Sequence, residues 1–132
     1  MDRNREFEIT DEYGKYIEIK ASGWEQLVED LSGGNQQKVV LAKWIATKPR
    51  ILIMDEPTKG IDVATKATVH NFISELAKQG IAVILISSEL PEILGMSHNI
   101  IVMHEGVVTA KFTRKEANSE KTIKAAIGSI SK

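Results

Sequence analysis

The feature that most constrains the fold is a pair of short aliphatic runs separated by a stretch with helical periodicity. Residues 51–54 and 81–86 carry no polar side chain, a pattern typical of strands buried on both faces. The intervening helix is predicted over residues 63–79, with Gly80 as the residue that ends it. Its apolar stripe is Val69, Phe72, Ile73 and Leu76. Strand–helix–strand alternation with buried strands predicts an α/β fold with a mostly parallel sheet.

Further elements are predicted on both sides of this core. We expect helices over residues 10–19, 35–47, 89–94 and 119–127, with the charged first nine residues frayed. Residues 100–103 and 107–112 read as a C-terminal hairpin, and Thr113–Glu116 matches a capping box. In the 35–47 helix, Trp44 is expected in the core and Lys38 in solvent.

Composition narrows the class of protein. The 132 residues include 17 basic and 18 acidic ones, so no excess charge favours a nucleic-acid partner. There is no cysteine, which suits a reducing compartment and excludes a cysteine-based metal site. The longest apolar run is too short to span a membrane and the first residues lack a signal-peptide core, so membrane association would require a partner.

The acids that follow the first aliphatic run are the strongest chemical signal. Asp55 and Glu56 would lie at the carboxyl edge of a parallel sheet, where α/β proteins bind ligands. In a phosphate site the first acid can hold Mg²⁺ and the second can orient an attacking water. The alternative is an ordinary strand-to-loop junction with nothing bound.

A glycine-rich helix start is the second signal. Ser32, Gly33 and Gly34 precede or open the 35–47 helix, where free amide N–H groups and the helix dipole favour an anion. The alternative is a serine-capped helix entry with no ligand, and taken alone this motif does not decide between the two.

Together the two motifs resemble the ABC ATPases. Leu31-Ser32-Gly33-Gly34-Asn35-Gln36 corresponds to the signature motif of that family, and the strand ending in Asp55-Glu56-Pro57-Thr58 to its Walker B motif. The resemblance covers residues 11–112 and implies a partial P-loop (RecA-like) ATPase core. Residues 10–47 would be a remnant of the helical subdomain with the signature motif, 48–112 the core from Walker B to the switch loop, and 113–132 a helical tail.

Finer features resemble one branch of that family. The segments 31–38, 55–66 and 87–97 are similar to the second cassette of double-cassette importers for ribose, galactose and related sugars. The resemblance implies ATP and Mg²⁺ as cofactors, with Asp55 toward the metal, Glu56 as the catalytic base, and Ser32, Gly33, Gly34, Gln36, Asp62 and Ser88 toward the nucleotide. The implied partners are an opposing cassette, permease subunits and, indirectly, a sugar-binding protein, on the cytoplasmic side of the membrane.

The sequence departs from the family at two points. It contains no Gly-x-x-x-x-Gly-Lys-[Ser/Thr] pattern, since Gly14-Lys15 has Ile9 at the first-glycine position and Tyr16 after the lysine. Ser88 stands where the family carries its switch histidine. We therefore expect a piece of a cassette that does not hydrolyse ATP by itself, in which the signature motif closes over ATP held by an opposing cassette.

Two other functions are compatible with the sequence. The chain could be a non-catalytic module that donates the signature motif or mediates dimerisation, or it could belong to an ABC protein of DNA repair or translation. The near-neutral charge and the segments 34–38 and 87–92 argue against the latter. Without a P-loop strand beside residues 81–86, a sheet edge would be open, which predicts repacking, strand exchange or self-association.

Overall fold

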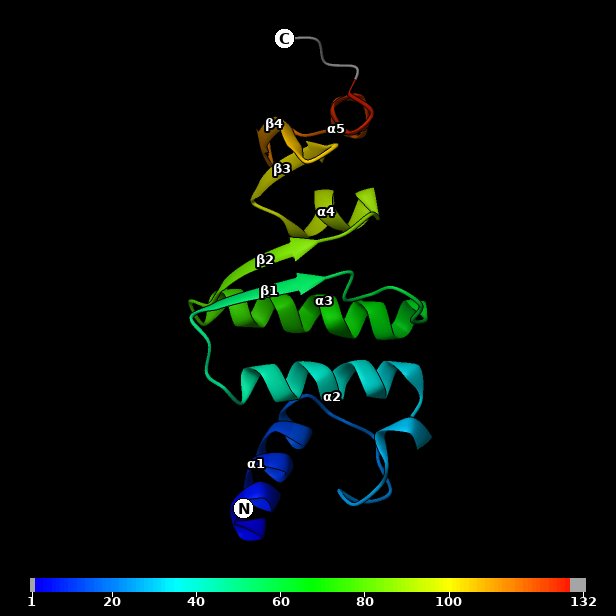
Figure 1. Cartoon of the computed structure of the whole chain (residues 1–132), viewed down its shortest axis with the longest axis vertical. Helices are drawn as coiled ribbons and strands as arrows, with labels where there is room; N and C mark the ends of the chain where they lie inside the picture. The colour runs from blue at the N-terminus through cyan, green and yellow to red at the C-terminus, as the bar shows by residue number, and fades with distance from the viewer. Residues whose placement is uncertain (1, 129–132) are drawn as a thin grey trace. The chain divides into compact units, whose positions relative to one another are not determined.

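The computed structural model describes residues 2–128 and forms two compact units, residues 1–84 and 85–132. The elements, coloured along the chain in Figure 1, are α1 (Arg3–Tyr16), a 3-10 turn η1 (Val28–Asp30), α2 (Gly33–Ile45), β1 (Ile51–Asp55), α3 (Val63–Lys78), β2 (Ala82–Ile86), α4 (Leu90–Met96), β3 (Asn99–His104), β4 (Val107–Thr113) and α5 (Ser119–Ala126). The strands pair as β1–β2 and as β3–β4. No described helix is both long and apolar enough to cross a bilayer.

The predicted strand–helix–strand core is confirmed. The arrows of β1 and β2 point the same way in Figure 1, as expected for a parallel pair joined through α3. Helix α3 buries Val69, Ile73 and Leu76. It ends as predicted at Gly80, whose φ of 88° is left-handed; the N–H groups of Gly80 and Ile81 donate to the carbonyls of Ala77 and Leu76.

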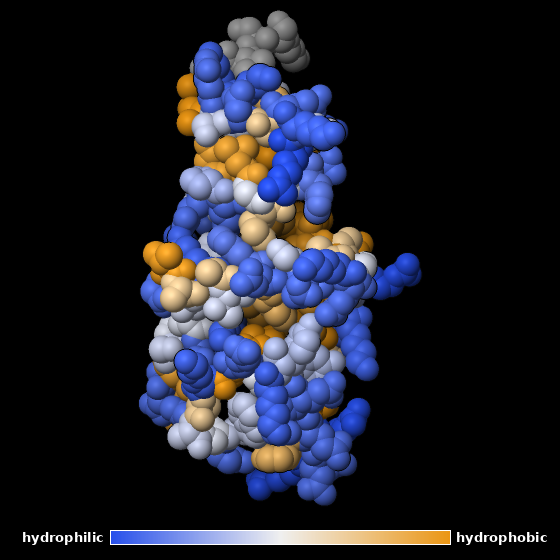
Figure 2. Space-filling view, turned by 180° about the vertical axis from the view of Figure 1, so that it is seen from behind, coloured by the Kyte–Doolittle hydropathy of each residue, from blue (hydrophilic) through white to orange (hydrophobic). Residues whose placement is uncertain are grey.

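The prediction that both strands are buried on two faces is wrong. In β1 the buried Leu52 and Met54 alternate with Ile51 and Ile53, which are 61% and 63% exposed. Every second residue of β2 is also exposed. Figure 2 shows apolar side chains reaching the surface among polar ones. A run of aliphatic residues is typical of a strand that is covered on both faces. Within the described residues, however, only one face of β1 is covered.

The C-terminal hairpin is confirmed in the second unit. Strands β3 and β4 pair antiparallel from Asn99 opposite Thr113 to His104 opposite Val107, with a bulge after Val102. Glu105 and Gly106 form the two-residue turn, and both have positive φ, as a type I′ turn requires. Helix α5 closes a small core formed by Ile100, Val102 and Ala125. Residues 129–132 of the predicted tail lie outside the described residues.

The capping-box prediction is half right. The Glu116 carboxylate accepts hydrogen bonds from the backbone N–H and hydroxyl of Thr113, and these bonds lower the pKa of Glu116. The turn they close does not begin the helix, because Asn118 caps α5 by accepting from the Lys121 N–H. The acid and the threonine stabilise a turn between β4 and α5 instead.

Three predictions in the first unit are wrong. Helix α1 begins at Arg3, because Asp2 caps it through the N–H groups of Asn4 and Arg5. Trp44 is 56% exposed, since it lies beside the buried stripe of α2 and not within it. Lys38 is buried, and its ammonium donates to the Glu18 carbonyl at 2.9 Å.

Gly14 lies within α1 despite its poor helix propensity, because it makes room for the Trp24 ring. A Cβ at Gly14 would lie 2.5 Å from the Trp24 ring, so the glycine lets that ring lie directly on the backbone of α1. The Asp11 carboxylate accepts a hydrogen bond from the Lys15 ammonium at 2.8 Å and one from the Trp24 indole N–H at 3.1 Å, and these bonds lower the pKa of Asp11. These contacts hold the loop before η1 against α1.

Candidate functional site

The first turn of α2 presents a set of unpaired backbone donors. Ser32 is the N-cap residue, and Ser32 and Gly33 are exposed. The first turn of a helix leaves its N–H groups without intrahelical partners. Among the described residues no hydrogen bond uses the N–H of Gly33 or Gly34. The positive end of the helix dipole adds to these donors, so this turn has the chemistry of an anion site.

Side chains around this turn hold its shape. The Asn35 side chain donates to the Ser32 hydroxyl oxygen at 3.0 Å and accepts from the Lys20 N–H at 2.9 Å. The Gln36 amide nitrogen donates to the Leu31 carbonyl at 2.9 Å, which ties the signature loop back onto itself. The Gln36 side chain, predicted to face the nucleotide, thus supports the loop in this structure.

Asp62 and the first turn of α2 both contact Thr65. It is the N-cap residue of α3, and its two carboxylate oxygens accept from the backbone N–H of Thr65 at 3.0 Å and from the Thr65 hydroxyl at 2.7 Å. The hydroxyl bond is the main cause that lowers the pKa of Asp62. The same Thr65 side chain fills the space next to Gly34. Sequence separation hid this proximity, and Thr65 was not among the predicted residues.

The carboxyl end of β1 carries the two predicted acids. Asp55 is exposed as the last residue of the strand, and Glu56 is half-buried in the turn that follows. Glu56 has a φ of 48°, an uncommon conformation for a residue other than glycine, and its carbonyl accepts from the Lys59 N–H at 3.1 Å. Such backbone conformations cost on the order of 1–3 kcal/mol and concentrate at functional sites. Thr58, within the same turn, is buried.

Asp55 and Glu56 are too few to hold a metal ion by themselves. Carboxylate oxygens are the ligands Mg²⁺ accepts, usually one or two of them completed by substrate phosphates. Within the described part of the chain no cluster of three or more acids or histidines could hold a metal alone. The residues therefore fit Mg²⁺ only as an ion brought with a phosphate ligand.

Ser88 belongs to the second unit, where it is exposed in the bend between β2 and α4. Its hydroxyl can donate or accept a hydrogen bond but has no proton-transfer capacity near neutral pH, unlike an imidazole. The remaining predicted site residues all belong to the first unit.

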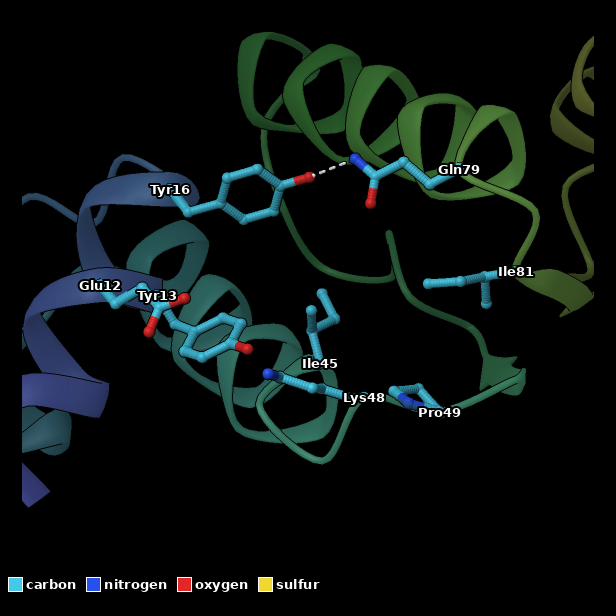
Figure 3. A pocket seen from close by; sticks show the side chains of 8 residues that line it. All are labelled: Glu12, Tyr13, Tyr16, Ile45, Lys48, Pro49, Gln79 and Ile81. Carbon is cyan, nitrogen blue, oxygen red and sulfur yellow. Dashed lines mark hydrogen bonds between the residues drawn. The ribbon is translucent and has the colours of Figure 1, made fainter. Parts of the chain in front are cut away.

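A cavity of about 490 Å³ lies away from all of these residues. Figure 3 shows its lining: Tyr13 and Tyr16 from α1, Ile45 from the end of α2, and Gln79 beyond the end of α3, with the Tyr16 hydroxyl accepting from the Gln79 amide at 2.8 Å. None of the predicted site residues lines it. Its lining includes the C-terminal ends of α2 and α3, whereas Ser32 and Asp62 lie at the N-terminal ends of these helices.

The comparison with known families agrees with the residues above. The family model described as ABC transporter matches residues 3–59. Ribose import ATP-binding protein RbsA 1 of Rhizobium meliloti (strain 1021) is 54% identical over 123 residues, which are 93% of this chain. This chain belongs to the ABC transporter ATP-binding family. The match extends past both motifs of the cassette and through the C-terminal hairpin.

Other relatives and solved structures place the chain within a cassette. Ribose import ATP-binding protein RbsA of Jannaschia sp. (strain CCS1) is also 54% identical over 93% of the chain, but these residues are 24% of that relative. The chain thus spans about a quarter of the length of the curated relatives it matches. The fold resembles the dimeric bacterial ABC transporter cassette MJ0796 with a TM-score of 0.75 and 23% identity, over 86% of this chain and 49% of that one. The cassette MJ1267 in its ADP conformation gives 0.75 and 23% over 95% and 49%.

Proposed function

We propose that this chain is part of the ATP-binding component of a sugar importer, in which it supplies the signature motif to ATP held by an opposing cassette. The observation that carries the proposal is the first turn of α2: no hydrogen bond among the described residues uses the N–H of the exposed Gly33 or the half-buried Gly34, and the side chains of Asn35, Gln36 and Thr65 lie against this turn. Phosphate oxygens are suitable ligands for such a turn, since each charge-assisted hydrogen bond contributes about 1.5–3 kcal/mol.

The roles of the individual residues follow from their placement. Ser32, Gly33 and Gly34 would donate to the γ-phosphate, with Gln36 holding the loop. Asp62, at the start of α3, would lie beside them toward the nucleotide held by the opposing cassette. Asp55 would take part in a Mg²⁺ site completed by the phosphates of a nucleotide bound on its own cassette, and Glu56 would orient the attacking water there. Because Ser88 stands where the family carries its switch histidine, we expect this second site to be slow.

The partners follow from the same arrangement. A dimeric cassette such as MJ0796 is the precedent for an opposing cassette. The 54%-identical relatives are named ribose import proteins, which supports a sugar as cargo and favours an importer over a repair or translation ATPase. Permease subunits, and through them a sugar-binding protein, would hold the component at the cytoplasmic face of the membrane. The chain by itself, lacking the phosphate-cradling pattern, is expected neither to hydrolyse ATP nor to bind it at micromolar concentrations.

We also propose the division of the chain along the cassette. Residues 10–47 would belong to the helical subdomain, 48–112 to the ATPase core from Walker B to the switch loop, and 113–132 to a C-terminal tail. The identity with importer relatives on both sides of residue 48 supports this order.

The test is an exchange into a full-length relative. The aligned 123 residues of the Rhizobium meliloti protein are replaced by those of this chain, and ATPase activity is measured with the cognate permease in vesicles. We expect transport-coupled ATPase activity to be retained, and Glu56→Gln to lower it by less than about threefold, because the competent site lies under the signature motif. An inactive but folded exchange protein would refute the proposal. A loss with Glu56→Gln as large as that of a signature variant would mean that the competent site was assigned wrongly.

A further inference from the structure

Thr65 connects two functional segments that are far apart in sequence. Its hydroxyl donates to one Asp62 carboxylate oxygen at 2.7 Å, and its backbone N–H donates to the other at 3.0 Å. Both oxygens of Asp62 are therefore oriented by a single residue, one turn into α3. A carboxylate held by two donors has a fixed direction, whereas an exposed aspartate with one bond can rotate.

The Thr65 side chain also contacts the first turn of α2. A Cβ built on Gly34 would lie 2.6 Å from the Thr65 methyl carbon and 2.7 Å from its hydroxyl oxygen, so the threonine occupies the space that any other residue at position 34 would need. Figure 1 shows α2 and α3 starting at the same end. The absence of a side chain at Gly34 is what lets α3 approach the first turn of α2 so closely.

We propose that Thr65 is a positioning residue that links the Asp62 carboxylate to the first turn of α2, so that the aspartate and the signature amides meet an opposing cassette as one preorganised surface. The inference rests on the proposed function. The two parts of the Thr65 side chain act differently: the hydroxyl orients the carboxylate, which is the larger effect, and the methyl contributes to the spacing from Gly34. Preorganised donors lower the cost of ordering when two surfaces close on a ligand.

Two variants separate the role of the Thr65 hydroxyl from that of its methyl group. Thr65→Val keeps the shape and the contact with Gly34 but removes the hydroxyl. Thr65→Ser keeps the hydroxyl and removes the methyl. Thr68→Val is the matched control, because the Thr68 hydroxyl lies on the same helix and donates only to the Ala64 carbonyl of its own helix, at 3.2 Å.

The activity arm uses the exchange protein described above. We expect Thr65→Val to lower kcat of the ATPase about tenfold while KM for ATP stays within about twofold, because the opposing P-loop still binds the nucleotide and only closure suffers. Thr65→Ser should retain most of kcat, and Thr68→Val all of it. Equal activity of Thr65→Val and wild type would overturn the proposal. A loss in Thr65→Ser without one in Thr65→Val would also overturn it, since packing alone would then matter.

The second arm uses the full 132-residue chain and does not depend on ATPase activity. The pKa of Asp62 is followed by carbon-detected NMR. Thr65→Val should raise it toward that of an ordinary aspartate, and Thr65→Ser should leave it low. If the wild-type exchange protein hydrolyses no ATP, the proposed function fails, and this titration decides on Thr65 alone. An Asp62 pKa unchanged by Thr65→Val would then refute the link.

Discussion

The first turn of α2 and the carboxyl end of β1 both carry polar groups that we propose face a nucleotide, but they differ in which groups support them. Around Gly34 the supporting contacts all come from the chain itself: Asn35, Gln36 and Thr65 hold the turn and its neighbour Asp62. At β1 the described residues offer no group of three or more acids or histidines for a cation, so we propose that phosphate oxygens complete the ligand set there. In the proposed function one half-site is thus supported within this chain, whereas the other is completed by a nucleotide.

The largest effect is expected from a negative charge placed in the first turn of α2. Ser32→Asp should lower ATPase activity of the exchange protein roughly a hundredfold or more, because like charges juxtaposed at an interface cost several kcal/mol. Thermal unfolding should be unchanged or slightly raised, since aspartate is as good an N-cap as serine and favours the helix dipole.

Asn118→Asp is the control for this variant, because it adds the same charge at the N-cap of α5. It should leave ATPase activity unaltered. If Ser32→Asp retained activity, or lost it only together with stability, the first turn of α2 would not be a phosphate-binding element.

Gly34→Ala tests the packing that completes the half-site. The added methyl would meet Thr65 at 2.6 Å, and overpacking of this kind costs about 1–3 kcal/mol of unfolding free energy. Gly33→Ala is the matched control, since nothing lies within 4 Å of a Cβ there and the change should be neutral or stabilising. Chemical denaturation of both variants measures the difference. Equal stabilities would show that α2 and α3 are not in close contact at this point.

The exposed face of β1 gives a third prediction. Because Ile51 and Ile53 are exposed on a short strand, we expect the chain to self-associate, with sedimentation that depends on concentration. Ile53→Lys should weaken this association about tenfold, the effect of losing one interface anchor. Phe7→Lys, which removes an exposed apolar side chain from α1, should not. A wild-type chain that stays monomeric at every concentration would contradict the prediction.

The smallest expected effect is a pH dependence from Asp62. Its pKa is lower in the folded chain because of the bonds from Thr65, so its contribution to stability is present above the pKa of an unfolded aspartate. That contribution is lost as the pH falls through the lower, folded value. Asp62→Asn, which keeps an N-cap acceptor, should therefore give a shallower loss of stability on acidification. Identical slopes in urea unfolding at acidic pH would show that Thr65 does not hold the carboxylate.

Sequence patterns predicted the elements that depend on local physics. Gly80 ends α3 and Glu105-Gly106 turns the hairpin because positive φ is required at those residues. Predictions failed where a neighbour decides the outcome. Trp44 lies on the exposed side of α2, and β1 is covered on one face only, because burial depends on what packs against an element as well as on its own periodicity.

The candidate site divides in the same way. The order of the signature and Walker B motifs determined the family, and local chemistry determined that the turn at Ser32–Gly34 favours an anion. The sequence indicated Thr65 only weakly: it lies three residues after Asp62, which is the spacing of an N-cap hydrogen bond. Nothing in that spacing indicated Gly34.

The sequence by itself determined the α/β class, the family and the residue types available to a nucleotide. Only the tertiary structure decided that Gly34, Thr65 and Asp62 form one contact set. The reason is physical: periodicity and capping act over a few residues of chain, whereas the close approach of α2 and α3 depends on which side chain fills the space above a glycine.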